Sequence, residues 1–253
     1  MDFIFVAIIG ALWGSFANVC ILRLPESKGV VSGRSFCPNC KKLIIWKDNI
    51  PIISFLLLKR KCRQCKKPIS FQYTLVEILS LISFLSIYYL YGISLTTLLL
   101  IILAFTFIII FFIDLKHFII PNSLTFPLMA LGFIKSFIPN LDEIFPNYLD
   151  SLIGGLFGYG IIWSIIFFYK QVRKKDGMGL GDAKLFAVIG FWFGWISIPF
   201  VIFLSSIIAL LSVIPDLIKN LKKMTTQIPF GPYIIIGTLV YLFFENNLRS
   251  IIF

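Results

Sequence analysis

Two aspartates stand where apolar runs of the chain begin or end, and they are the residues best suited to chemistry. Asp182 opens an apolar run and closes the sequence Gly179-Leu180-Gly181-Asp182, whereas Asp114 ends the run 98–113. A carboxylate at the mouth of a membrane span is costly, so its presence there indicates a function. Glycines 179 and 181 would let a substrate backbone approach Asp182 closely, because no Cβ stands in the way.

The two acids can act as a pair if the fold brings them to one membrane face. Asp114 and Asp182 are 68 positions apart, which is enough chain to cross a bilayer twice. Two carboxylates that share a proton titrate separately, so that one is ionised while the other is protonated. The ionised group can take a proton from water, while its partner protonates or hydrogen-bonds a peptide carbonyl. This pattern predicts an aspartyl protease at the edge of a bilayer.

Each acid also has a purely structural interpretation. Asp114 could form a salt bridge with Lys116, and Asp182 could be the N-cap of a helix. His117 either tunes the charge of Asp114 or is an interfacial residue without a catalytic role. Glu77 is expected to hydrogen-bond either within the helix bundle or to the cysteine-containing loop.

Four cysteines form two short motifs in the loop 23–70. Cys37 and Cys40 belong to one Cys-x2-Cys knuckle, Cys62 and Cys65 to another, and 21 residues separate the two. Two such knuckles can present four thiolates to one tetrahedral zinc ion, and with no open position the metal is structural. A loop of this size cannot bury much core, so zinc would supply folding energy. Cys20, in an apolar run, is a small packing residue.

The composition predicts an all-α polytopic membrane protein. The chain has 253 residues, of which 58% are hydrophobic and 14% charged. A span needs about 20 mainly apolar residues. We expect eight spans, with the least certain boundary between the sixth and seventh: 3–22, 71–91, 95–113, 122–138, 149–169, 183–198, 199–218 and 231–248. This predicts a first transmembrane helix within 1–22, a zinc-binding loop at 23–70 and a transmembrane core over 71–253.

The fifth of these segments contains four glycines, which are predicted to form a helix-packing face. They are Gly154, Gly155, Gly158 and Gly160. Small residues four positions apart allow a neighbouring membrane helix to approach closely.

The basic residues predict the orientation in the membrane. Residues 23–70, 170–184 and 219–223, together with Lys116, hold 21 of the 23 Lys and Arg residues. The positive-inside rule then places both termini outside, and the cysteine loop and both acids on the cytoplasmic side. The net charge of +11 thus reflects topology and contact with anionic lipid, and no nucleic-acid partner is expected.

Several ordered segments resemble type IV prepilin peptidases, bifunctional leader peptidases and N-methyltransferases of bacterial membranes. A single Gly-x-Gly-Asp would be weak evidence, but the matching segments run nearly from end to end. They are Gly14–Val19, Arg23–Pro25, the two cysteine knuckles with Trp46 and Asn49–Pro51 between them, Pro68–Ser70, Leu75–Glu77, Asp114–His117, Ile120–Pro121, Gly177–Lys184 and Pro229–Pro232.

The resemblance implies a site and two reactions. Asp114 and Asp182 would be catalytic, and the substrate cleft would include Gly179, Gly181, Lys184, Pro229, Phe230 and Gly231. The enzyme would cleave type IV prepilins or pseudopilins on the cytoplasmic side, after the last glycine of the leader. It would then methylate the new N-terminal residue with S-adenosylmethionine. The expected location is the bacterial inner membrane, and the oligomeric state is left open.

Two departures from the family pattern bear on these expectations. Lys59-Arg60-Lys61 precedes the third cysteine, where the family commonly has a glycine in a stretch linked to methyl transfer. Asn122 follows the Ile-Pro pair, where an aspartate is common, and this departure does not touch the proposed dyad. One alternative is therefore a peptidase that does not methylate. A more distant one is an ion or metal transporter with a cysteine sensor loop, in which ion flux would depend on Asp114 or Asp182.

Overall fold

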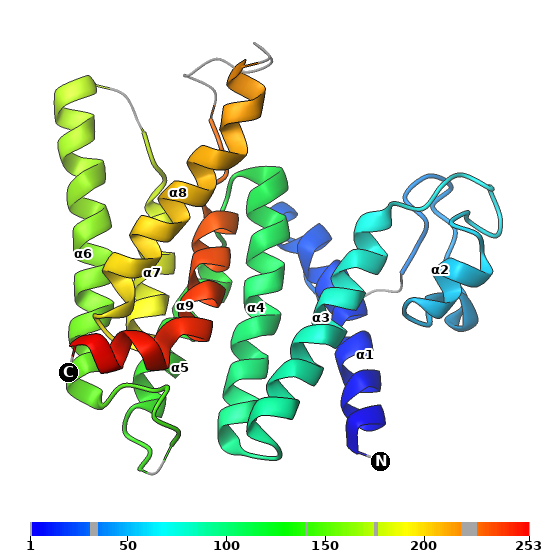
Figure 1. Ribbon diagram of the computed structural model, residues 1–253. Coiled ribbons are helices and arrows are strands. Elements are labelled where there is room, and N and C mark those ends of the chain that lie inside the picture. Colours follow the sequence, from blue (N-terminus) through cyan, green and yellow to red (C-terminus); the bar gives the residue numbers. More distant parts are fainter. Residues whose placement is uncertain (1, 31–34, 140, 175–176, 219–226, 253) are drawn as a thin grey trace. The chain divides into compact units, whose positions relative to one another are not determined.

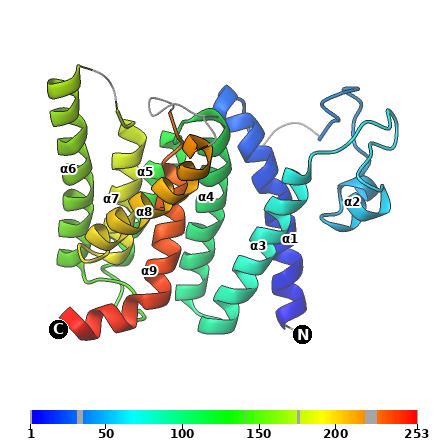
Figure 2. The same ribbon diagram turned by 45° about the horizontal axis from the view of Figure 1, so that its top comes forward.

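The computed structural model describes residues 2–30, 35–139, 141–174, 177–218 and 227–252, and most of them are helical (Figures 1 and 2). Within these residues, the only β-structure is two isolated bridges, Phe36–Leu43 and Lys61–Pro68. The all-α prediction is therefore confirmed. The chain divides into two compact units, Met1–Ile109 and Ile110–Phe253, and the boundary falls within helix α4 (Leu95–His117).

The first unit is built on two long helices that lie side by side, α1 (Asp2–Arg23) and α3 (Phe71–Tyr91) (Figures 1 and 2). Their close approach depends on glycines of α1. A Cβ at Gly14 would stand 2.6 Å from Cα of Glu77, so no larger residue fits there. The chain between the two helices forms the cysteine loop, with the short helices η1 (Leu24–Glu26), η2 (Trp46–Asn49) and α2 (Ile53–Leu57).

Local signals set both ends of α3. The Ser70 hydroxyl caps the start by accepting a hydrogen bond of 3.3 Å from the N–H of Gln72. Gly92 ends the helix with φ of +59°, a left-handed conformation that glycine adopts without a Cβ clash. The observed helix coincides with the predicted span 71–91.

The second unit is arranged around α7 (Leu180–Phe193), which contacts helices on several sides. Ten of its 14 residues are buried, as expected for a helix that is apolar all round. Its neighbours are α5 (Asn122–Lys135), α6 (Tyr148–Arg173), α8 (Ser197–Ile218) and α9 (Gly231–Ile252). Asp182 is thus carried by the central element of this unit.

Glycines bring α6 and α7 into close contact. A Cβ at Gly154 would lie 2.5 Å from the carbonyl oxygen of Gly190, and one at Gly158 would lie 2.5 Å from that of Phe186. Gly155 faces the ring of Phe191, which a Cβ would meet at 2.4 Å. The predicted packing face is confirmed for these three glycines. It is wrong for Gly160, where an added Cβ would meet nothing within 4 Å.

Helices occur at all eight predicted spans, but only five described helices are long and apolar enough to cross a membrane. These five are α1, α3, α4, α6 and α8. Helices α5 and α7 have 14 residues each, which corresponds to about 21 Å against a hydrocarbon core of about 30 Å. The apolar part of α9, Gly231–Phe244, is also shorter than a full span. The structure thus supports a membrane protein with five candidate spans.

The break between the sixth and seventh predicted spans lies earlier than expected. The prediction placed it between Ile198 and Pro199, but α7 ends at Phe193 and α8 begins at Ser197. Gly194 takes φ of +78° and turns the chain there, while Pro199 is accommodated in the first turn of α8. The predicted basic cluster 219–223 lies outside the described residues.

Candidate active site

Asp114 lies in the last turn of α4, and the residue is only 5% exposed. Its Oδ2 accepts a hydrogen bond of 2.9 Å from the backbone N–H of Gly231, the first residue of α9. A Cβ at Gly231 would lie 2.8 Å from this oxygen, so a larger residue would displace the carboxylate. The first N–H groups of a helix lack partners within the helix and carry partial positive charge, which suits a carboxylate.

Asp182 is the third residue of α7 and is 7% exposed. The interpretation of Asp182 as the helix N-cap is wrong, because Gly179 holds that position in an extended conformation. The N–H of Asp182 donates to the carbonyl of Gly179 over 3.1 Å. A Cβ at Gly179 would meet only Oδ2 of Asp182, at 3.7 Å, and the N of Gly181, at 3.8 Å, so the backbone there is open.

Ile120, on the turn after α4, links the segments that carry the two acids. A Cβ at Gly181 would lie 3.0 Å from Cβ of Ile120, and one at Gly231 would lie 3.3 Å from its Cδ1. Ile120 therefore packs against both the start of α7 and the start of α9. Asp114 accepts a hydrogen bond from Gly231 at the start of α9, and Asp182 directly follows Gly181 at the start of α7. The structure thus brings the two predicted acids together in one buried cluster.

The residues that follow Asp114 do not neutralise it. Lys116 and His117 are exposed, and no ion pair joins Asp114 to Lys116 within the described residues. The salt-bridge interpretation of Asp114 is therefore wrong. His117 lies exposed at the end of α4, as an interfacial residue would.

Lys184 holds the first turn of α5 to α7. Its Nζ donates a hydrogen bond of 2.7 Å to Oδ1 of Asn122 and lies 5.5 Å from the ring centroid of Phe126. Asn122 follows directly on the Ile120-Pro121 turn that packs against Gly181. The side chain that the sequence assigned to the cleft thus fastens the turn beside the two acids.

Pro229 and Phe230 form the extended, half-buried approach to α9. The carbonyl of Phe230 accepts hydrogen bonds of 3.0 and 3.1 Å from the N–H groups of Tyr233 and Ile234. These bonds start the helix and leave the N–H of Gly231 free to bind Asp114. The Pro-Phe-Gly-Pro segment therefore positions the donor that holds Asp114.

The four cysteines of the loop come together in the first unit. Their sulfur atoms all lie within 4.8 Å of one another, and the Sγ atoms of Cys37 and Cys65 are 3.9 Å apart. Tetrahedral zinc with Zn–S bonds of about 2.3 Å sets sulfurs about 3.8 Å apart, so the cluster fits zinc. Backbone N–H groups of Cys65 and Gln64 lower the pKa of the Cys62 thiol to about 7, whereas the neighbouring thiols raise the pKa of Cys65 to about 11. Cys62 is therefore the first of the two to become the thiolate that zinc binds.

The two knuckles have the same local geometry. The carbonyl of each first cysteine accepts a hydrogen bond from the fourth residue after it, Lys41 in one knuckle and Lys66 in the other, at 2.8 and 3.0 Å. Both lysines take positive φ, near +56° and +59°. Arg63 in the second knuckle donates to both carboxylate oxygens of Asp48 at 2.8 and 2.7 Å, which ties η2 to it. This pair lowers the pKa of Asp48.

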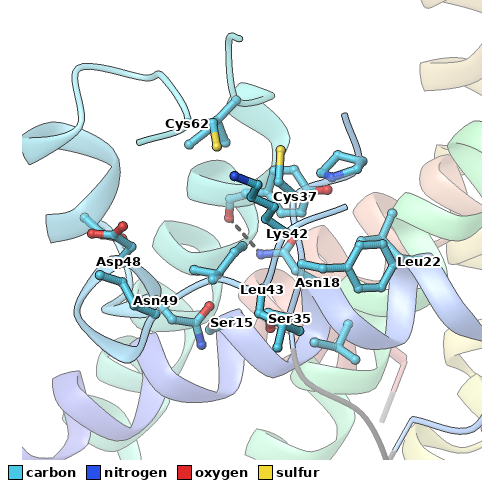
Figure 3. Close-up of a pocket in the computed structure, with 18 of the residues that line it drawn as sticks. Ser15, Asn18, Leu22, Ser35, Cys37, Lys42, Leu43, Asp48, Asn49 and Cys62 are labelled. Carbon is cyan, nitrogen blue, oxygen red and sulfur yellow. Dashed lines mark hydrogen bonds between the residues drawn. The ribbon is translucent and has the colours of Figure 1, made fainter. Parts of the chain in front are cut away.

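A cavity of about 810 Å³ lies between the cysteine loop and the helices α1 and α3 (Figure 3). Ser15, Asn18 and Leu22 of α1 line one part of it, and Cys37 and Cys62 line another (Figure 3). Nδ2 of Asn18 donates to the carbonyl of Tyr73 over 2.9 Å and so fixes α1 to α3 beside the cavity. Cavities of this volume suit a cofactor-sized molecule.

Glu77 projects from α3 into the wall of this cavity and is 9% exposed. Its Oε2 accepts a hydrogen bond of 2.7 Å from the N–H of Ile52 in the cysteine loop. Of the two partners expected for Glu77, the loop is therefore the one observed. Ile52 has φ of +62°, a conformation that is rare for a β-branched residue.

Three contributors to these sites were not predicted as such from the sequence. The N–H of Gly231 is a backbone donor, and the positions of Ile120 and Thr74 depend on tertiary packing. Thr74 lines the cavity, and its buried hydroxyl has no hydrogen-bond partner among the described residues. No local pattern signals any of these contacts.

Two family models match the chain. The model of the bacterial peptidase A24 N-terminal domain matches residues 8–91, and that of the type IV leader peptidase family matches residues 100–214. No solved structure matches the chain.

Three similar curated relatives bear the name prepilin leader peptidase/N-methyltransferase. The protein of Neisseria gonorrhoeae is 37% identical over 97% of this chain and 92% of its own length. That of Aeromonas hydrophila is 32% identical over 97% of this chain and 92% of its own length. That of Pseudomonas aeruginosa is 33% identical over 95% of this chain and 90% of its own.

Proposed function

Because the chain belongs to the type IV leader peptidase family, we propose that Asp114 and Asp182 form the catalytic dyad of a prepilin peptidase. The substrates are type IV prepilins or pseudopilins, cleaved after the last glycine of the leader. The observation that carries this proposal is the burial of both acids in one cluster, where the ends of α4, α7 and α9 meet.

In this proposal the two carboxylates divide the work of hydrolysis. One takes a proton from a water molecule as that water attacks the peptide carbonyl, and the other hydrogen-bonds or protonates the carbonyl oxygen. Oδ2 of Asp114 is held by the N–H of Gly231, so proton exchange falls to its Oδ1. No nucleophilic side chain is required. Because the two carboxylates share one proton, one is ionised while the other is protonated, and this allows the two roles.

The substrate must present an extended backbone at the dyad, because a helical segment holds its carbonyls in its own hydrogen bonds. Glycine at the cleavage site eases this unwinding, since it accepts conformations that other residues avoid. The open backbone at Gly179 leaves room for such a strand beside Asp182.

The proposed topology has eight spans, with both termini outside and the dyad and the cysteine loop at the cytoplasmic face. Five helices support it by their length and composition. The distribution of 21 of the 23 basic residues among the predicted cytoplasmic segments supports the orientation. Helices α5, α7 and α9 would complete the bundle as shorter elements, with the dyad near the membrane surface.

The second proposed activity is N-methylation of the new N-terminal residue. S-adenosylmethionine supplies a methyl carbon on a positively charged sulfur, and the 810 Å³ cavity of the first unit can hold a molecule of this size. The Cys37, Cys40, Cys62 and Cys65 cluster would hold zinc and order the loop that closes this cavity. The relatives' shared name supports this activity.

Mass spectrometry of a prepilin after incubation with the purified protein and S-adenosylmethionine tests both activities. We expect a mass loss equal to the leader, and one added methyl group on the product. Asp114→Ala and Asp182→Ala should each abolish cleavage while zinc content and membrane insertion are retained. Cleavage without methylation would identify a peptidase alone. If prepilins of the host stay intact, the dyad assignment is wrong.

A further inference from the structure

The strongest unexplained feature is a pair of polar side chains on α3, Thr74 and Glu77, in the wall of the 810 Å³ cavity. They are three positions apart and therefore lie on one face of the helix. Both are buried, at 4% and 9% exposed. Buried polar groups are normally satisfied by partners, so groups that lack them at a cavity point to a ligand.

Glu77 differs from the other acids that line the cavity. Among the described lining residues, Glu26 forms an ion pair with Lys28, and Asp48 forms one with Arg63. Glu77 instead accepts from a neutral backbone N–H, that of Ile52. A buried carboxylate without a cation is costly, because one N–H does not replace the hydration of a charge.

The basic residues of the cavity do not fill this role. Four of them, Lys28, Lys41, Lys42 and Arg63, are exposed, so water solvates their charges, and the fifth, Arg23, donates a hydrogen bond of 3.2 Å to the carbonyl of Gly29. Glu77 is the buried charge beside them, and no contact within the described chain joins it to any of the four. The wall at α3 is therefore suited to a cation from outside the chain.

Thr74 provides a second, independent indication. A threonine within a helix commonly bonds its hydroxyl to the carbonyl four residues before it. The hydroxyl of Thr74 makes no such bond within the described residues, although the atom is fully buried. An unpaired buried hydroxyl is costly, and because Thr74 lines the cavity, rotation of its side chain would turn the hydroxyl toward a ligand there.

We infer that Glu77, assisted by Thr74, binds the positive charge of an organic cation in this cavity. Its chemical class is a sulfonium or alkylammonium group. This inference rests on the proposed methyltransferase function, which supplies two such cations: the sulfonium of the methyl donor and the ammonium of the cleaved N-terminus. Glu77 is then the residue that recognises charge, while the shape of the cavity recognises the remainder of the molecule.

Binding to the full-length protein in detergent tests the inference with Glu77→Gln. The amide keeps an oxygen for the N–H of Ile52 and removes only the charge. Titration calorimetry would compare S-adenosylmethionine with S-adenosylhomocysteine, whose sulfur is neutral. If Glu77 meets the sulfonium, the variant should bind the first about tenfold or more weakly, as for a lost charge-assisted contact. Its affinity for the second should stay within about twofold.

A second readout separates the two sources of the cation. If Glu77 meets the ammonium, both adenosyl compounds bind normally, and the KM for a cleaved pilin peptide in the methylation assay rises about tenfold. Glu143→Gln is the matched control, because it makes the same change at an exposed acid of the second unit, outside the cavity. It should change none of these values more than about twofold.

Two results would overturn the inference. One is unchanged binding and unchanged KM in Glu77→Gln; the other is an equal loss of affinity for both adenosyl compounds, which indicates altered shape rather than lost charge. If Glu77→Gln loses zinc, Thr74→Val is tested instead, provided that its thermal stability is undiminished. Weaker ligand binding by this variant supports the inference, and unchanged binding overturns it. If the wild type neither binds the donor nor methylates, it is the proposed methyltransferase function that fails.

Discussion

The N–H of Gly231 donates a hydrogen bond of 2.9 Å to Oδ2 of Asp114, across 117 positions of sequence. This bond links the last turn of α4 to the first residue of α9. Any side chain at this position would enter the space occupied by the carboxylate. The contact therefore fixes one acid of the proposed dyad from the far end of the chain.

The first prediction concerns this contact. Gly231→Ala should lower the cleavage rate about tenfold to a hundredfold, because the added methyl group displaces a carboxylate that also loses part of a charge-assisted hydrogen bond. Methylation of an already cleaved peptide should be unchanged. Gly160→Ala is the matched control, since a Cβ there meets no atom within 4 Å. Cleavage as fast in the Gly231 variant as in the control would contradict this role.

The second prediction concerns the turn beside the dyad. Asn122→Ala removes the acceptor of the 2.7 Å bond from Lys184 and should slow cleavage several-fold, mainly in kcat, by loosening the turn that carries Ile120. Asn122→Asp should keep or raise the rate, because it turns the bond into an ion pair. Steady-state kinetics on one prepilin would compare the two. Equal rates in both variants would exclude a positioning role for this bond.

The third prediction concerns the departure from the family pattern before the third cysteine. Lys59 and Arg60 both take left-handed backbone conformations, with φ of +48° and +62°, where glycine is unstrained. Lys59→Gly should therefore stabilise the cysteine loop by up to about 1 kcal/mol. Lys61, which is not among the positive-φ residues, provides the control: Lys61→Gly should not stabilise it. The resistance of the loop to proteolysis measures both effects, and a less resistant Lys59 variant would contradict the prediction.

The left-handed backbone at Lys59 and Arg60 is a property of this segment that the sequence did not predict. The sequence shows lysine and arginine where the family commonly has glycine, and it cannot show that the backbone keeps a glycine-like conformation. The four cysteines were predicted to converge because the Cys-x2-Cys spacing itself determines a knuckle, and they do converge. The all-α fold was predicted because apolar runs of about 20 residues admit few other structures in a membrane.

Tertiary contacts account for what the sequence did not reveal. The proximity of Asp114 and Asp182 was expected from sidedness, but the donor at Gly231 and the contact of Ile120 with two helix starts arise only in the packed unit. Gly160 is a residue whose predicted packing role was wrong. It shares a glycine-rich segment with Gly154 and Gly158, yet it lies away from α7, because the sequence gives the spacing of small residues but not the face that meets a neighbour.

The fourth prediction concerns metal removal. A chelator that strips zinc should make the cysteine loop sensitive to proteolysis and abolish methylation, while cleavage at the dyad in the other unit persists. Reloading should depend on pH. Zinc binds thiolates, so the thiols of the four cysteines must lose their protons before the metal binds, and a falling pH opposes this. Zinc uptake, followed with a metal-sensitive dye, should therefore weaken below pH 7. Uptake that is equally strong well below pH 7 would contradict this.

The central claim is that Asp114 and Asp182 act as one unit, and a double-mutant comparison of cleavage rates tests it most directly. Asp114→Asn and Asp182→Asn keep the size of each side chain while removing its charge. Each single variant should lose at least about a thousandfold in rate, and the double variant should be no slower than either, because residues that act together are not additive. Substantial cleavage by one single variant, or losses that multiply in the double variant, would contradict a shared dyad.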